Sequence, residues 1–218
     1  MRFPRLVLCN APGEAFLARP LVGEGGDAEI PWVGVASGHA AGRFVLAERS
    51  EPAVDRSLVA EAGEHLRGLP WSWSVAEQSG FLWFKKPSLL RAYGDLGVSA
   101  TEMATDGGGV DDLSTEVLLV PKALREAAEQ LRAGTLAVIV PKRGWLLAKA
   151  AEPGDLGATS ALFQMETGIA QRGGQHALCA TTVVFVRDGV PVGVEVRAGG
   201  GYVSLSPPSE AAWFMARE

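Results

Sequence analysis

The side chains best suited to nucleophilic chemistry are two cysteines and three histidines. His176 and Cys179 stand three positions apart, and Cys9 and His39 are the remaining thiol and imidazole that a pair could use. A thiol becomes a strong nucleophile when a neighbouring histidine takes its proton. In a strand, residues i and i+3 point to opposite faces, so His176 and Cys179 meet only at a turn or a helix end. A small hydrolase or transferase with a Cys/His pair is therefore the alternative hypothesis.

The sequence lacks the motifs that commonly hold metals or phosphates. Structural zinc needs four converging ligands, whereas this chain has His39, His65 and His176 and no pair of cysteines two residues apart. The glycine runs at 107–109 and 199–201 match neither the dinucleotide-binding nor the P-loop pattern. We therefore expect no metal and no cofactor.

Aromatic residues gather in a segment that predicts a β-hairpin. Trp71 and Trp73 alternate with serines, as a half-buried strand requires. Phe81 and Trp83 lie in a second apolar run, which we expect to pair with the first across a turn near residues 79–80. Aromatics then occupy both faces, so the hairpin is either packed between two layers or presents one face to another molecule. The predicted binding residues for a protein partner are Trp71, Trp73, Phe81 and Trp83.

Composition and charge restrict the class of partner. The chain has 218 residues, and its 47% hydrophobic content is typical of a globular protein. Its formal net charge of −5 and dispersed basic residues do not suit a phosphate backbone, so we expect no nucleic-acid partner. The apolar run at 6–9 is too short for a signal sequence, and no later run approaches the roughly 18 residues of a membrane span. We expect a soluble, cytoplasmic protein without a disulfide.

Periodicity and turn residues predict both strands and helices. Residues 32–36 and 43–48 read as a hairpin with a loop at 37–42. The other expected strands are 5–9, 117–120, 135–140, 145–150 and 202–205, and the expected helices are about 55–68, 121–134 and 156–171, with a short helix opened by Pro87 around 89–93.

The strongest local signal is a hairpin at 181–197. Asp188 and Gly189 separate two runs that are rich in β-branched residues. Both central residues of a type I′ turn need positive φ, and Asp-Gly is favoured in that turn. We therefore expect a tight two-residue turn with positive φ at Gly189.

The order of these elements predicts an α+β fold, in which helices pack on one or more mainly antiparallel sheets. Only the step from 117 to 140 offers a parallel crossover. The length suits one globular unit of residues 1–218. The glycine-rich stretch near 104–112 is where a boundary between two closely associated lobes would fall.

Four segments of the C-terminal half follow one another in a recognisable order. They are an apolar strand that ends in Val-Pro at 136–141, a second apolar strand at 146–148, a helix and Gly-Gly turn at 165–174, and the hairpin at 181–197. This order resembles the YtpQ-type family of bacterial proteins, and the acidic stretch before Val117 is similar to that family's entry to a helix. The resemblance implies the fold of this half. It supplies no substrate, cofactor or catalytic residue.

The favoured hypothesis is a non-catalytic interaction or regulatory module with an unknown protein partner. It depends on the aromatic surplus in 71–84 and on the lack of a convergent set of polar side chains in the sequence. Neither the process nor the oligomeric state is indicated by the sequence.

Overall fold

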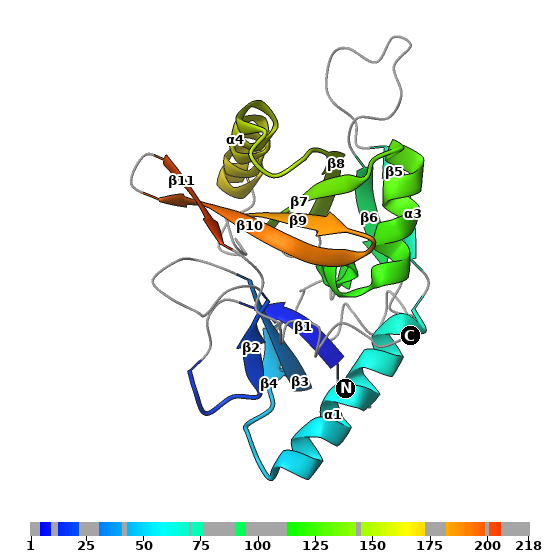
Figure 1. Cartoon of the computed structure of the whole chain (residues 1–218). Coiled ribbons are helices and arrows are strands. Elements are labelled where there is room, and N and C mark those ends of the chain that lie inside the picture. Colours follow the sequence, from blue (N-terminus) through cyan, green and yellow to red (C-terminus); the bar gives the residue numbers. More distant parts are fainter. Residues whose placement is uncertain are drawn as a thin grey trace.

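The computed structural model describes residues 5–9, 13–21, 31–40, 43–69, 71–75, 90–94, 113–142, 145–172, 182–198 and 201–205. These residues form two β-sheets, three α-helices and one 3-10 helix. Every described strand pair in both sheets is antiparallel, so the predicted α+β class with mainly antiparallel sheets is confirmed. Figure 1 shows the smaller sheet below the larger one.

The smaller sheet is built around its longest strand. Its members are β1 (Arg5–Cys9), β2 (Ala18–Pro20), β3 (Trp32–Ala40) and β4 (Arg43–Leu46), and β3 pairs with all three others. The predicted β3–β4 hairpin is confirmed, but its loop is shorter than expected because residues 37–40 continue the strand. The register shifts between Ala36 and Gly38, so the small residues form a β-bulge and the pairing of β3 with β4 continues beyond it.

The larger sheet has seven strands in the order β11-β10-β9-β7-β8-β6-β5. In Figure 1 the order runs from β11 at the left to β5 at the right. The strands are β5 (Trp71–Val75), β6 (Leu90–Gly94), β7 (Thr135–Lys142), β8 (Trp145–Ala150), β9 (Thr182–Arg187), β10 (Val190–Ala198) and β11 (Gly201–Leu205).

The β9–β10 hairpin has the predicted turn. Asp188 and Gly189 have φ values of 53° and 79°, as a type I′ turn requires. The tip of this hairpin meets the start of the helix α3 (Pro121–Leu131), because a Cβ built on Gly189 would lie 2.5 Å from the carbonyl oxygen of Pro121. Both the positive φ and the close approach of Pro121 therefore require glycine at position 189.

The remaining helices are α1 (Pro52–Arg67), η1 (Leu113–Leu119) and α4 (Leu156–Arg172). The predicted helices at 121–134 and 156–171 are confirmed as α3 and α4, within a few residues. Helix α1 begins at Pro52 and not at Asp55, since Pro suits the first turn. Asp55 instead reaches back, and its Oδ1 accepts hydrogen bonds from the backbone N–H and hydroxyl of Ser50 at 3.0 and 2.9 Å.

Two predicted elements are wrong. Residues 117–120 belong to η1 and the residue after it, so the parallel crossover does not exist. All four are buried, and a short apolar run buried on every side has no period that separates strand from helix. The segment around 89–93 is strand β6 and not a helix, because pairing with β5 and β8 overrides the local signal of Pro87.

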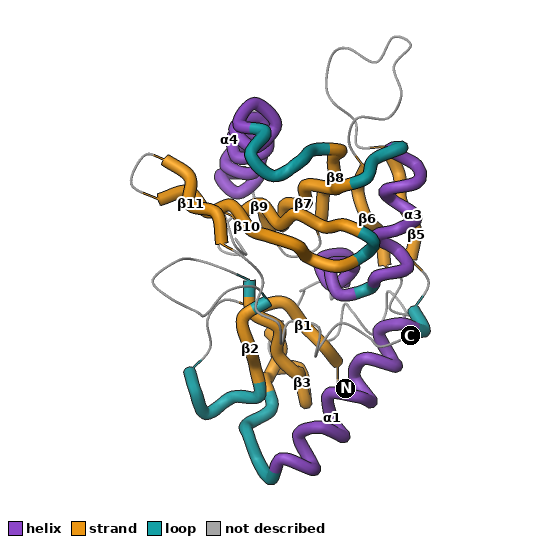
Figure 2. Tube along the Cα trace, in the orientation of Figure 1, coloured by secondary structure: helices purple, strands orange, loops and turns teal. Residues whose placement is uncertain are grey.

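Alternate residues of the larger sheet face two different layers. Ala137 and Ile139 of β7 pack with Leu162 of α4, whereas Leu136 and Val138 join the cluster that includes η1 and α3. Figure 2 shows α4 apart from α3, with strands between them. The period of two in β7 therefore places one helical layer on each face.

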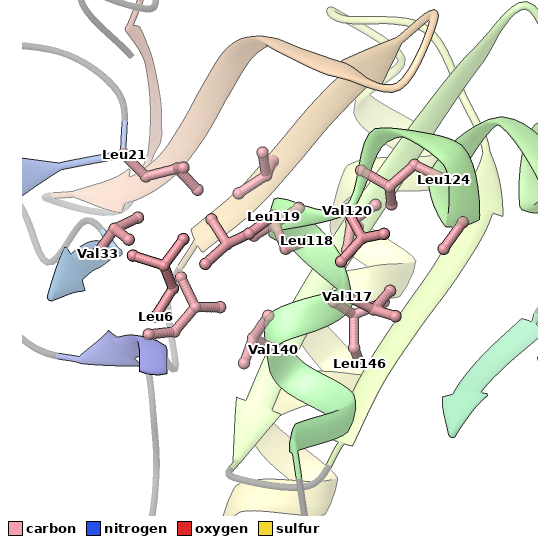
Figure 3. Close-up of a cluster of buried hydrophobic side chains, with 14 of the residues drawn as sticks. Leu6, Leu21, Val33, Val117, Leu118, Leu119, Val120, Leu124, Val140 and Leu146 are labelled. Atoms are coloured by element: carbon pink, nitrogen blue, oxygen red, sulfur yellow. The ribbon is translucent and has the colours of Figure 1, made fainter. Parts of the chain in front are cut away.

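One buried cluster takes side chains from both sheets. Figure 3 shows Leu118 and Leu119 of η1 in the same group as Leu6 and Val33 of the smaller sheet. The single globular unit of residues 1–218 stays a prediction. The predicted lobe boundary near 104–112 lies outside the described residues.

Candidate interaction site

Trp71 and Trp73 lie on the same face of β5, two residues apart, and both are half-buried. The indole N–H of Trp71 donates to the carbonyl oxygen of Leu66 near the end of α1 at 3.2 Å. The indole N–H of Trp73 donates to the carbonyl oxygen of Ala123 in α3 at 2.8 Å. Both rings pack against the main core cluster. They are thus held in fixed positions while part of each ring remains accessible.

The strand that pairs with β5 differs from the predicted one. Along one edge β5 pairs with β6, from Trp71 opposite Gly94 to Val75 opposite Leu90. Phe81 and Trp83, which we expected in the hairpin partner, lie outside the described residues. The structure therefore brings together two of the four predicted binding residues.

Among the described strands, β5 is the last at its end of the larger sheet. Within the described ranges, no strand pairs with its second edge. Edge strands are commonly protected by lysine, proline or inward-pointing charge, but Trp71–Val75 contains none of these. Ser72, on the face opposite the tryptophans, is exposed. This edge can accept another strand without placing a charge against it.

Glu116 is a buried carboxylate whose burial the sequence does not predict. Its side chain joins η1 to the smaller sheet, because Oε1 accepts a hydrogen bond from the backbone N–H of Leu8 at 2.9 Å. Oε2 accepts a second one from the hydroxyl of Thr115 at 2.5 Å, and both Glu116 and Thr115 are 0% exposed. A substrate has no access to this carboxylate, so its role is to hold the two sheets together. The signal was a glutamate directly before the apolar run at 117–120.

Glu195 of β10 performs a similar task at the start of α4. Its two oxygens accept hydrogen bonds from the backbone N–H of Gly154 at 2.9 Å and from the hydroxyl of Thr159 at 2.7 Å. Asp155 caps the same helix, since its Oδ1 accepts from the N–H of Ala158 at 3.0 Å. Glu195 is 3% exposed, and its oxygens are engaged with the helix start. The group positions α4 and offers no accessible chemistry.

A third polar group lies on the surface beside the β9–β10 hairpin. Arg187 Nη2 and Glu152 Oε2 form an ion pair at 3.0 Å, and their side chains are 53% and 61% exposed. The Thr135 hydroxyl donates to Glu152 at 3.0 Å and accepts from Arg187 Nε at 3.1 Å. Ion pairs as exposed as this one contribute little to stability.

The predicted Cys/His pairs receive no support from the geometry. His176 and Cys179 lie outside the described residues. Cys9 is a half-buried cysteine opposite Trp32 at one end of β3, whereas His39 lies near the other end. At about 3.3 Å per residue, the seven steps from Trp32 to His39 place these backbone positions about 23 Å apart. Cys9 and His39 therefore do not form a catalytic pair.

Comparisons of the chain with protein-family models, curated proteins and solved structures gave no match. The resemblance to the YtpQ-type family stays a prediction. Within the described part of the chain, no three His, Cys, Asp or Glu side chains gather as a metal site. None of the helices in that part is long and apolar enough to cross a membrane.

Proposed function

We propose that the protein is a non-catalytic interaction or regulatory module, and that the second edge of β5 binds an extended segment of a protein partner. The observation that supports this proposal is the position of β5 at the end of the larger sheet, with no described strand on its second edge. An added strand gains backbone hydrogen bonds along the edge, and side chains beside the edge supply specificity.

Trp71 and Trp73 are the anchors in this proposal. Both indole N–H groups already donate to backbone carbonyl oxygens of α1 and α3, so the rings lose little conformational entropy when a partner binds. Half-buried tryptophans are frequent among residues that carry binding energy. The partner strand would cover the part of each ring that the core leaves accessible.

The partner is a protein and not a nucleic acid in this proposal. A net charge of −5 opposes binding to a phosphate backbone, and β5 itself contains no basic residue. We place the module in the cytoplasm, where a chain with only two cysteines needs no disulfide.

Replacing Ser72 with lysine tests the proposal without disturbing the core. Ser72 is exposed, so the variant should keep its melting temperature within about 2 °C, as surface substitutions commonly do. A lysine on the edge opposes strand addition. The partner is first captured by the wild-type protein and purified. We expect the immobilised Ser72→Lys variant to bind that purified partner about tenfold more weakly than the wild type does.

Ser57→Lys is the matched control, because Ser57 is also an exposed serine but lies on α1. This variant should bind the purified partner like the wild type. If Ser72→Lys folds normally and binds as tightly as the wild type, the β5 edge is not the binding site and the proposal fails.

A further inference from the structure

We infer that Gly189 is a positioning residue for the binding site at β5. The tip of the β9–β10 hairpin sets where α3 begins, and the first turn of α3 holds the ring of Trp73. The inference rests on the proposed function, because it concerns the placement of one of its two anchors. It depends on two close contacts of α3, one at Pro121 and one at Ala123.

The first contact joins the hairpin tip to the backbone of α3. Gly189 is buried in the turn, although Asp188 and Val190 on either side of it are exposed. A Cβ built on Gly189 would lie 2.5, 3.0 and 3.0 Å from three backbone atoms of Pro121, the first residue of α3. Backbone atoms cannot turn aside as a side chain does. A side chain at 189 therefore pushes the hairpin tip and the helix start apart by about 1 Å, to ordinary van der Waals separation.

The hairpin tip is braced by the sheet, so the helix start is the part that moves. Strand β9 pairs with β10 on one side and with β7 on the other, up to Arg187 opposite Thr135. The side chain of Arg187 adds a bond at the same place, because its Nε donates to the Thr135 hydroxyl at 3.1 Å. The last residue before the turn is thus tied to the middle strand of the larger sheet.

The second contact joins the same helical turn to the binding site. The indole N–H of Trp73 donates to the carbonyl oxygen of Ala123, two residues after Pro121, at 2.8 Å. Neighbours in one helical turn move together, and both Pro121 and Ala123 are buried, so close packing transmits the displacement. In Figure 1, α3 lies beside both the hairpin tip and β5. A shift of about 1 Å at Pro121 therefore takes this hydrogen bond out of its normal geometry, and the ring loses its fixed position.

Gly189→Asn tests this link, and Gly154→Asn is its matched control. Asparagine tolerates positive φ better than most residues with a Cβ, and the two glycines have similar φ values of 79° and 85°. In the described part of the chain, no heavy atom beyond the immediate neighbours lies within 4 Å of a Cβ built on Gly154. Only the variant at 189 therefore adds a contact with α3.

Hydrogen exchange of the indole N–H groups in the free protein measures the effect, by nuclear magnetic resonance with isotope-labelled tryptophan. The signal of Trp73 is the one that Trp73→Phe removes. We expect this N–H to exchange about threefold faster or more in Gly189→Asn. The indole N–H of Trp71 should keep its wild-type rate, because its acceptor Leu66 lies on α1. Gly154→Asn should change neither rate.

Two results would overturn the inference. An equal acceleration at Trp71 and Trp73 would mean general destabilisation, and an unchanged rate at Trp73 would mean that the hairpin tip yields instead of α3. If Gly189→Asn does not fold, Gly189→Ala places the same Cβ with nothing larger attached and is measured in the same way.

Binding of the purified partner shows whether the position of the Trp73 ring matters to the site. Gly189→Asn should bind about threefold more weakly or worse, and Gly154→Asn should bind like the wild type. In a Trp73→Phe background, Gly189→Asn should weaken binding no further, because the hydrogen bond that it disturbs is already gone. Additive losses of binding free energy would contradict the route through Trp73.

Failure of this inference differs visibly from failure of the proposed function. Unchanged Trp73 exchange in Gly189→Asn overturns the inference even where Ser72→Lys still blocks the partner. If Ser72→Lys and Trp73→Phe both bind the partner like the wild type, the proposed function fails. Faster Trp73 exchange in Gly189→Asn would in that case still support the placement of the ring by the hairpin tip.

Discussion

Replacing Gly189 with valine should lower the free energy of unfolding by about 3 to 5 kcal/mol. Two costs add in this variant. The φ of 79° is strained for a β-branched residue, and the new Cβ would lie 2.5 Å from the backbone oxygen of Pro121, which no rotamer change can relieve. Thermal unfolding measures the loss, at about 2 to 4 °C for each kcal/mol in a chain of this size.

Gly154→Val separates these two costs. Gly154 also has positive φ, at 85°, but no heavy atom outside its immediate neighbours lies within 4 Å of its built Cβ. Its replacement should therefore show the backbone strain alone, about 1 to 3 kcal/mol. If the two valine variants lose equal stability, the contact between the hairpin tip and α3 does not contribute as described.

Replacing Glu116 with alanine should be as costly, at about 3 to 5 kcal/mol. The backbone N–H of Leu8 and the hydroxyl of Thr115 both lose their carboxylate acceptor in a fully buried place, and a cavity opens between η1 and β1. Chemical denaturation with urea measures the change. The smaller sheet should lose protection from hydrogen exchange first, because the carboxylate joins it to the rest of the core.

Two further glutamate variants define the origin of that loss. Glu116→Gln keeps the shape and one acceptor oxygen, so it should cost clearly less than the alanine variant. Glu152→Ala removes an exposed carboxylate and should cost about 1 kcal/mol or less. Equal stability of the Glu116→Ala and Glu152→Ala proteins would show that the buried carboxylate does not hold the sheets together.

Local signals in the sequence predicted the elements whose structure is locally determined. The sequence predicts the Asp188-Gly189 turn because its conformation needs residues that tolerate positive φ, and both residues have positive φ in the structure. Pro121 at the first position and an apolar face predict helix α3, and that face is buried in the structure. These signals depend on neighbours in sequence and need no knowledge of the remaining fold.

The two wrong element predictions lie where contacts with residues distant in sequence decide the structure. Residues 117–120 are enclosed by both sheets, so every side chain is apolar and the period is lost. Strand β6 is set by pairing with β5 on one side and β8 on the other, and the sequence at 90–94 does not show this. Within the candidate site, the sequence predicts Trp71 and Trp73 on one face of a strand but not their hydrogen-bond acceptors on α1 and α3, because those contacts form only after the layers pack.

Hydrogen exchange at the backbone amides of β5 tests most directly whether its second edge binds another strand. The amides that point away from β6 have no described partner, so they should exchange quickly at low protein concentration. They should become protected when the purified partner binds and its strand pairs with them, and Ser72→Lys should abolish that protection. Exchange in 71–75 that is the same in the free and associated states, while another segment becomes protected, would contradict binding at this edge.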